Sequence, residues 1–208
     1  MYLYHYGPFF RRLFPKLMWR VRTSEKKIFM TFDDGPIPGP TEFVLDELAK
    51  FNAKATFFCV GENIKNHPEI FKRLHQEGHR VGNHTYNHLN GRKTSFKKYL
   101  ENVSKCQQLI PSEIAGDTKL FRPPYGLFTK NQKEALRKKY DVVMWEVLSA
   151  DFSPTISPEK CLKKSIKHCR EGSIIVFHDS LKTIDKLKYV LPRFLAHFTD
   201  KGYTFETI

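Results

Sequence analysis

The chain has 208 residues, of which 40% are hydrophobic and 14% aromatic, and it carries a formal net charge of +13 with a pI near 9.6. This length suits one domain with a single core, and the composition excludes a disordered chain. No apolar run approaches the roughly 20 residues that span a bilayer, which excludes a transmembrane helix. The positive charge favours anionic partners such as an acidic glycan, nucleic acid or an anionic membrane surface, without choosing among them.

Residues 1–26 form a basic and aromatic segment. Six lysines and arginines alternate there with aromatic residues, and Pro8 and Pro15 interrupt the apolar stretches. We therefore expect no cleavable signal peptide, and a protein that is cytoplasmic or peripheral to a membrane. We expect the segment to pack across the base of its own domain, residues 27–208. Contact between the segment and an anionic membrane surface is the alternative.

The four cysteines point to no disulfide framework. Cys59, Cys106, Cys161 and Cys169 form no C-x-x-C pair, and a domain of this size does not need disulfides for stability. We expect reduced, buried thiols.

Strand and helix patterns alternate through residues 27–208. Short apolar, β-favouring runs predict strands over 28–32, 54–60, 79–83, 119–122, 141–147, 173–177 and 203–208. Apolar residues recur at helical spacing over 41–52, 68–77, 96–110, 129–139, 158–168 and 181–198. Such alternation is typical of an α/β fold with a parallel sheet covered by helices. We expect a distorted (β/α) barrel of about seven parallel strands.

Two adjacent carboxylates, Asp33 and Asp34, follow the first predicted strand, which Gly35 and Pro36 then end. Adjacent residues that leave a strand point in different directions, so one carboxylate can bind a cation while the other accepts a proton. The same four residues also suit an ordinary acidic turn. The functional interpretation therefore depends on partners elsewhere in the chain.

Two histidines are candidate partners. His84 and His88 are four residues apart, so on one helical turn both imidazoles would face the same way and could hold a metal ion, with Asp34 as third ligand. Two histidines and one carboxylate form the ligand set of a hydrolytic zinc site with an open position for water. Such a histidine pair arises easily by chance in a chain with nine histidines, but this pair follows a predicted strand.

Three further polar residues, Arg122, Asp151 and His178, lie at or just beyond the ends of other predicted strands. In a parallel barrel these ends open on one face, where groups distant in sequence converge. Taken singly, a surface arginine, a turn aspartate and a capping histidine are ordinary interpretations. Taken together, the positions predict a shared site.

The segments T-F-D-D-G-P (31–36), H-T-Y-N-H (84–88), R-P-P-Y (122–125), the region of Asp151, and V-F-H-D (176–179) resemble, in order, the five motifs of the NodB-homology polysaccharide deacetylases, carbohydrate esterase family four. The resemblance spans residues 27–208. It implies a distorted (β/α) barrel and metal-dependent removal of acetyl groups from N-acetylated amino sugars in a polysaccharide or glycan precursor. The implied cofactor is a divalent metal, zinc first, with cobalt or nickel as alternatives. The implied partner is an N-acetylated glycan. The positive charge of the chain is compatible with an acidic glycan.

The resemblance also implies a role for each matched residue. In the catalytic set, Asp33 would be the general base and Arg122 the arginine that holds it. The backbone N–H of Tyr125 would stabilise the oxyanion. His178 would be the general acid, and Asp151 the carboxylate that tunes this acid. The metal ligands would be Asp34, His84 and His88. The substrate contacts would be Tyr125, Phe152 and Val176. Because Phe152 stands where the family commonly has tryptophan, it lacks the indole N–H donor, which affects substrate preference more than chemistry.

Three other functions stay open. A catalytically inactive glycan-binding module would use the same groove, although such a module has no need of a free base beside a metal ligand. A related hydrolase would cleave other non-peptide C–N bonds, such as those of formamides and cyclic amides. A nucleic-acid binder fits the net charge, but we expect none, because the sequence has no zinc-finger spacing or RNA-binding signature and its basic residues are spread along the chain.

Overall fold

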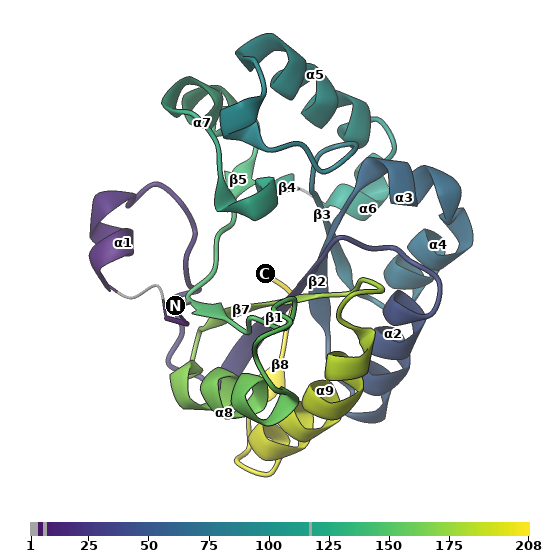
Figure 1. Ribbon diagram of the computed structural model, residues 1–208, viewed down its shortest axis with the longest axis vertical. Helices are drawn as coiled ribbons and strands as arrows, with labels where there is room; N and C mark the ends of the chain where they lie inside the picture. Colours follow the sequence, from purple (N-terminus) through teal and green to yellow (C-terminus); the bar gives the residue numbers. More distant parts are fainter. Residues whose placement is uncertain (1–3, 6–7, 117) are drawn as a thin grey trace.

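The computed structural model describes residues 4–5, 8–116 and 118–208. Strands lie at the centre and helices surround them (Figure 1). The strands are β1 (Lys27–Asp33), β2 (Ala55–Cys59), β3 (Arg80–Asn83), β4 (Leu120–Phe121), β5 (Asp141–Val142), β6 (Val147–Leu148), β7 (Ile174–His178) and β8 (Thr204–Phe205). The α-helices are α1 (Pro8–Leu13), α2 (Pro40–Lys50), α3 (Gly61–Asn66), α4 (Pro68–Gln76), α5 (Phe96–Gln107), α6 (Ser112–Ala115), α7 (Lys130–Leu136), α8 (Pro158–His168) and α9 (Ile184–Thr199). Two short 3₁₀ helices are η1 (Gly91–Lys93) and η2 (Pro124–Gly126).

The strands pair in parallel in the order β5-β4-β3-β2-β1-β7-β6, and β8 pairs with β1. The sheet curls into a half-barrel, which confirms the predicted (β/α) barrel class. In the register of β1 and β7, Asp33 lies opposite His178. Because parallel strands end on the same side, the motif residues at their carboxyl ends share one rim.

An extended part of the N-terminal segment crosses the open side of the half-barrel, between the edge strands β5 and β6. The N–H of Met18 donates to the Val142 carbonyl, and the N–H of Met144 donates to the Met18 carbonyl. A few residues later, the N–H of Val21 donates to the Gly172 carbonyl just before β7. Part of the predicted 1–26 segment, residues 1–3 and 6–7, lies outside the described residues, and the domain boundary at 26/27 stays a prediction.

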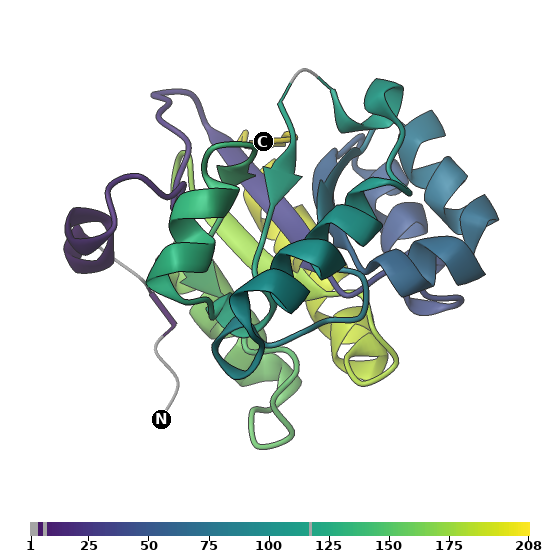
Figure 2. The same cartoon turned by 90° about the horizontal axis from the view of Figure 1, so that it is seen from above.

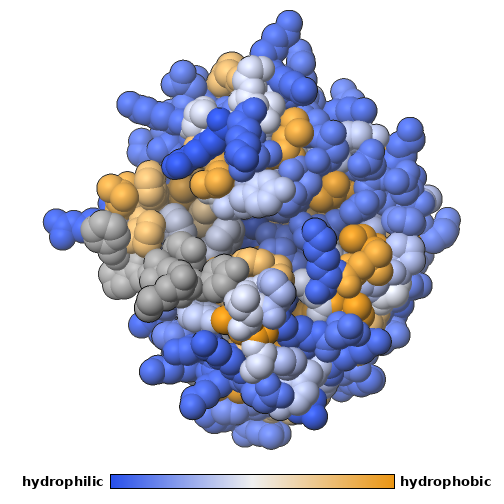
Figure 3. Space-filling model, viewed as in Figure 1, coloured by the Kyte–Doolittle hydropathy of each residue, from blue (hydrophilic) through white to orange (hydrophobic). Residues whose placement is uncertain are grey.

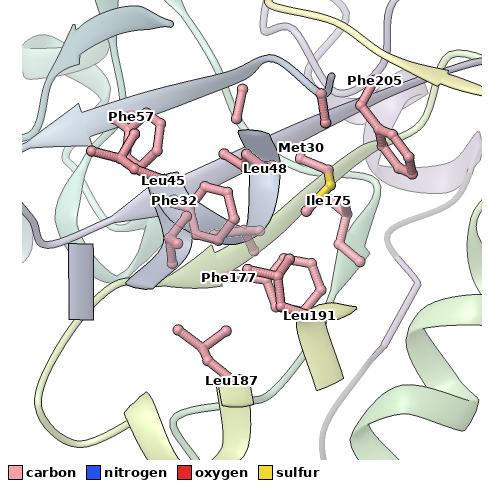
Figure 4. Close-up of a cluster of buried hydrophobic side chains, with 14 of the residues drawn as sticks. Met30, Phe32, Leu45, Leu48, Phe57, Ile175, Phe177, Leu187, Leu191 and Phe205 are labelled. Carbon is pink, nitrogen blue, oxygen red and sulfur yellow. The ribbon is translucent and has the colours of Figure 1, made fainter. Parts of the chain in front are cut away.

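The main hydrophobic core lies between the central strands and helices α2 and α9 (Figure 4). Phe32 of β1 stacks on Phe57 of β2 and on Phe177 of β7, with ring centroids 5.1 and 5.9 Å apart. Burying each such side chain contributes about 2–3 kcal/mol. Because side chains alternate along a strand, Thr31 and Asp33 then face the inside of the barrel, toward the rim.

The prediction of one strand over 141–147 is wrong, because the structure has two short strands there, β5 and β6. After β5 the chain leaves one edge of the sheet, and the N–H of Glu146 donates to the Ile174 carbonyl beside the opposite edge, where β6 begins. The short helices α3 and α6 were not predicted, since six and four residues are too few to show an apolar period. Cys59, Cys106 and Cys161 are free and buried as expected, whereas Cys169 is free but only partly buried.

Helix α1 projects from the body of the domain, as the view from above shows (Figure 2). Among the residues that the structure describes, no helix combines the length and apolar character needed to cross a membrane.

Candidate active site

Asp33, the last residue of β1, is buried beside a buried arginine. Its Oδ1 accepts a hydrogen bond of 2.7 Å from Nη1 of Arg122, which also donates to Oγ1 of Thr31 at 2.7 Å. The guanidinium further donates to the carbonyls of Val143 and Met144. A buried guanidinium with this many fixed acceptors is well oriented, and it holds the Asp33 carboxylate in one position. The structure thus brings together Arg122 and Asp33, as predicted from the sequence.

Asp34 follows in a backbone conformation of positive φ, 89°, which turns its side chain away from that of Asp33. Its Oδ1 lies 3.2 Å from Nε2 of His88 and 3.9 Å from Nε2 of His84. Burial alone raises the pKa of the Asp34 carboxyl, but His88, His178 and His84 together hold this pKa well below its usual range. Asp34 is therefore a carboxylate at neutral pH.

The turn that presents both aspartates is held by Asp179, a residue that we did not single out from the sequence. Oδ1 of Asp179 accepts from the N–H of Gly35 at 3.1 Å, and Oδ2 accepts from Oγ1 of Thr41 at 2.6 Å. A Cβ atom at Gly35 would lie 2.0 Å from Oδ2 of Asp179, so only glycine fits there. Burial raises the pKa of Asp179 to about 8. The only sequence signal for this role is its place directly after His178.

His84 and His88 lie on a loop after β3, and the predicted helical turn is wrong. Thr85 and His88 have φ values of 65° and 57°, which are incompatible with an α-helix. Long-range contacts set this path: Oδ1 of Asn102 in α5 accepts from the N–H of Tyr86 at 2.8 Å. The loop still brings both imidazoles to Asp34, so the predicted grouping of the three side chains is present although its conformation is not.

His84 is oriented so that it could bind a metal ion. Its Nδ1 donates to the Arg122 carbonyl at 2.8 Å, which leaves the lone pair of Nε2 facing Asp34. Burial lowers the pKa of His84 to about 4, so the ring is neutral at pH 7. Across the described residues, Asp34, His84 and His88 are the group of three whose candidate ligand atoms lie within 4.8 Å of one another.

His88 contacts Tyr125, one of the predicted substrate contacts. Its Nδ1 lies 3.2 Å from the hydroxyl of Tyr125, and the two rings meet edge-on with centroids 4.7 Å apart. Tyr125 has a φ of 61° within η2, and its side chain is 62% exposed. An exposed aromatic ring fixed beside a candidate metal ligand is placed to contact a substrate.

His178 ends β7 and is bonded twice to buried Asp151. Its Nδ1 lies 2.8 Å from Oδ1 of Asp151, and its backbone N–H donates to Oδ2 at 2.7 Å. Burial on its own lowers the pKa of His178, but the charge and hydrogen bond of Asp151 outweigh burial and raise the pKa to about 10. The ring of Phe152 meets His178 edge-on at 5.2 Å. With Nδ1 held by Asp151, the proton that His178 can deliver is the one on Nε2.

Val176 is buried in β7 two residues before His178, so both side chains project from the same face of the strand. This position suits an apolar floor under a small substrate group. Its contact with substrate stays a prediction, as do the catalytic roles of the other residues.

Comparisons with known proteins place these residues in a family. The family model described as polysaccharide deacetylase matches residues 20–143. A peptidoglycan-N-acetylglucosamine deacetylase of Bacillus cereus is 33% identical to this chain over 91% of this chain and 90% of the relative. The crystal structure of the peptidoglycan N-acetylglucosamine deacetylase Bc1960, with a bound benzamide, superposes with a TM-score of 0.83 at 30% identity, over 96% of this chain and 94% of that one.

The fold alone does not decide activity. A further similar structure, with a TM-score of 0.80 and 25% identity over 93% of this chain and 70% of that one, is a mutant of the pseudoenzyme BA3943 with restored enzymatic activity. The arrangement of site residues in each chain therefore has to be considered on its own. The family match over more than half of the chain, together with these relatives, shows that the chain belongs to the NodB-homology polysaccharide deacetylases, carbohydrate esterase family four.

Proposed function

We propose that this chain is a metal-dependent hydrolase that removes acetyl groups from N-acetylated amino sugars of a glycan, with peptidoglycan as the substrate class. The observation that carries the proposal is the grouping of Asp34, His84 and His88 at the rim, with Asp33 and His178 on neighbouring strands beside it. Relatives named as peptidoglycan N-deacetylases support the choice of substrate class.

The three proposed ligands fit a divalent metal. Oδ1 of Asp34 is buried and faces Nε2 of His88 and Nε2 of His84, at 3.2 and 3.9 Å, and a buried carboxylate oxygen between two imidazoles suits a cation. Two imidazole nitrogens and one carboxylate oxygen match the donor set of zinc, with cobalt or nickel as alternatives. When bound, such a metal supplies a positive charge that polarises an acetamide carbonyl and lowers the pKa of a water molecule to about 7.

Asp33 would act as the general base. Its Oδ1 is occupied by Arg122, while its Oδ2 lies 3.9 Å from Nε2 of His84 and faces the proposed metal site. This carboxylate can take a proton from the attacking water while Arg122 prevents it from rotating. Arg122 is thus a positioning residue in this proposal.

His178 would act as the general acid. An amide nitrogen leaves only after protonation, because the free amine anion is too basic. His178 is charged at neutral pH, and Asp151 orients it so that Nε2–H is the proton to be delivered. The backbone N–H of Tyr125 would stabilise the oxyanion of the tetrahedral intermediate. The acetyl methyl would rest on Val176, and Phe152 would contact the sugar.

The test is acetate release from a peptidoglycan-derived oligosaccharide by metal-loaded protein. We expect Asp33→Asn to lose about 10²–10⁴-fold in kcat with its metal content unchanged, because it removes the base alone. We expect His84→Gln to lose bound metal as well as activity. Matched controls are Asp200→Asn and His75→Gln, whose side chains are exposed on α9's end and on α4. Activity of Asp33→Asn near that of the wild type would disprove the assigned base.

A further inference from the structure

A groove lined by aromatic side chains runs from the proposed catalytic centre toward the N-terminal segment. It is a cavity of about 490 Å³. Some of its lining residues lie between residues 10 and 19 of the N-terminal segment, and others lie between residues 125 and 145. Its aromatic lining residues are Phe10, Phe14, Trp19, Tyr125, Phe128 and Trp145. In surface view, apolar residues gather where α1 lies in Figure 1 (Figure 3). The volume falls within the range of about 300–1,000 Å³ typical of ligand sites.

The groove adjoins the proposed catalytic centre through Tyr125. Tyr125, which lines it, places its hydroxyl 3.2 Å from Nδ1 of His88. Trp145, on the groove floor, faces the guanidinium of Arg122 with 5.7 Å between the charge and the ring. Tyr125 thus belongs both to the groove and to the surroundings of the proposed metal site, so a glycan with its acetamide at that site would have its next sugar units beside the groove.

The N-terminal wall of the groove is fixed to the domain. Nε1 of Trp19 donates to the Phe14 carbonyl at 3.2 Å, and Nζ of Lys133 in α7 lies 5.3 Å from the centroid of the Phe14 ring. Nε of Arg137, the residue that follows α7, donates to the Lys16 carbonyl at 3.2 Å. A wall held in this way binds a ligand with little loss of conformational entropy.

The charge of the groove selects for an anion. Among the described residues, three cations line it, Arg92, Lys130 and Lys133, and no carboxylate does. Lys133 also lies 3.6 Å from Glu134, which partly neutralises it. The side chains of Arg92 and Lys130 form no ion pair with any residue that the structure describes, and both residues are exposed. They are available to a ligand carboxylate.

We propose that this groove binds the sugar units next to the one that is deacetylated, and that it selects glycans whose neighbouring sugar carries a carboxylate. The apolar faces of sugar rings would pack against the aromatic walls, while Arg92 and Lys130 would bind the carboxylate. This inference rests on the proposed function for its substrate. It adds a specificity site, contributed in part by the N-terminal segment, to the rim residues already described.

The experiment compares two N-acetylated tetrasaccharides, a neutral one of N-acetylglucosamine and an acidic one in which N-acetylglucosamine alternates with N-acetylmuramic acid. We expect the wild type to show a higher kcat/KM for the acidic substrate. In Arg92→Gln/Lys130→Gln the ratio of acidic to neutral kcat/KM should fall about tenfold, because two exposed charge contacts are lost. The control Lys138→Gln/Lys139→Gln removes the same charge at exposed positions further along the chain and should keep the wild-type ratio.

Binding is measured separately from catalysis. Both tryptophans of the chain, Trp19 and Trp145, line the groove, so the acidic tetrasaccharide should change tryptophan emission in Asp33→Asn protein, which lacks the proposed base. A saturable change in emission that weakens with added salt and in Arg92→Gln/Lys130→Gln supports binding in the groove. This holds even if the wild type releases no acetate, because that result would refute only the proposed function.

Three outcomes would overturn the groove proposal. The first is an equal ratio of acidic to neutral kcat/KM in Arg92→Gln/Lys130→Gln and in the control Lys138→Gln/Lys139→Gln. The second is unchanged tryptophan emission with the acidic tetrasaccharide. The third is that Arg92→Gln/Lys130→Gln loses binding to phosphatidylglycerol vesicles while its ratio of acidic to neutral kcat/KM stays that of the wild type. This result would assign the two cations to a membrane surface instead.

Discussion

Asp151 sets the charge of His178, and replacing it with asparagine isolates that effect with almost no change in shape. In the wild type, the two carboxylate oxygens accept from Nδ1 and from the backbone N–H of His178. An asparagine amide offers only one accepting oxygen. If that oxygen serves the backbone N–H, the amide NH₂ faces Nδ1, and only a neutral ring with its proton on Nε2 can accept from it.

The size of the change follows from the pKa of His178. The rise from the ordinary value of 6.5 to about 10 corresponds to about 5 kcal/mol of preference for the charged ring, and Asp151 is its principal source. Without this carboxylate, burial dominates and lowers the pKa of His178. We expect a pKa at or below 6.5 in Asp151→Asn, and a loss of about 10²–10⁴-fold in kcat at pH 8, where the acid would then be deprotonated.

The direct assay is NMR titration of the His178 ring in metal-free protein, followed by pH–rate profiles of the metal-loaded enzyme. Asp200→Asn, exposed at the end of α9, is the matched control and should leave the titration unchanged. If His178 still titrated near 10 in Asp151→Asn, the assignment of its charge to this carboxylate would be refuted.

Three further outcomes follow from the same contacts. Arg122→Met should lower the free energy of unfolding by about 3–5 kcal/mol, because Asp33 is left buried without its partner, and chemical denaturation measures this. A stability equal to the wild type's would contradict the buried pairing. Gly35→Ala should cost about 3 kcal/mol by the same measurement, because the new Cβ displaces Asp179; tolerance of alanine would show that the turn is looser than described. Finally, a raised pKa of His178 stabilises the fold fully below pH 6.5 and progressively less as pH rises toward 10, so the unfolding free energy of metal-free protein should fall across that window. Asp179, with its pKa raised to about 8, contributes to the slope below pH 8, so Asp151→Asn should reduce the slope most clearly between pH 8 and 10.

The part of the site that lies at strand ends could be predicted from the sequence. Asp33 and His178 end two strands that pair in parallel, and Arg122 directly follows a third. Strand patterns are local, and parallel pairing alone brings their carboxyl ends to one rim. That is why residues far apart in sequence could be assigned to one place before any coordinates were known.

The loop conformations could not be predicted, because distant residues determine them. The path of residues 84–88 depends on a hydrogen bond from Tyr86 to Asn102 in α5, so the spacing of the two histidines gave the correct grouping through an incorrect helix. Asp179 supports the aspartate turn through Gly35 and Thr41, a contact that spans most of the chain. Local sequence carries no record of such partners.

The crossing of residues 18–21 over the open side of the half-barrel bears on how the protein can be shortened. A fragment that begins at Lys27 would uncover the Val142 carbonyl and the Met144 N–H, which now form hydrogen bonds with Met18. An uncovered strand edge pairs readily with another copy of itself, so such a fragment should precipitate or form oligomers on size-exclusion chromatography. We therefore expect the autonomous folding unit to extend at least to Met18, upstream of the position where the first barrel strand begins.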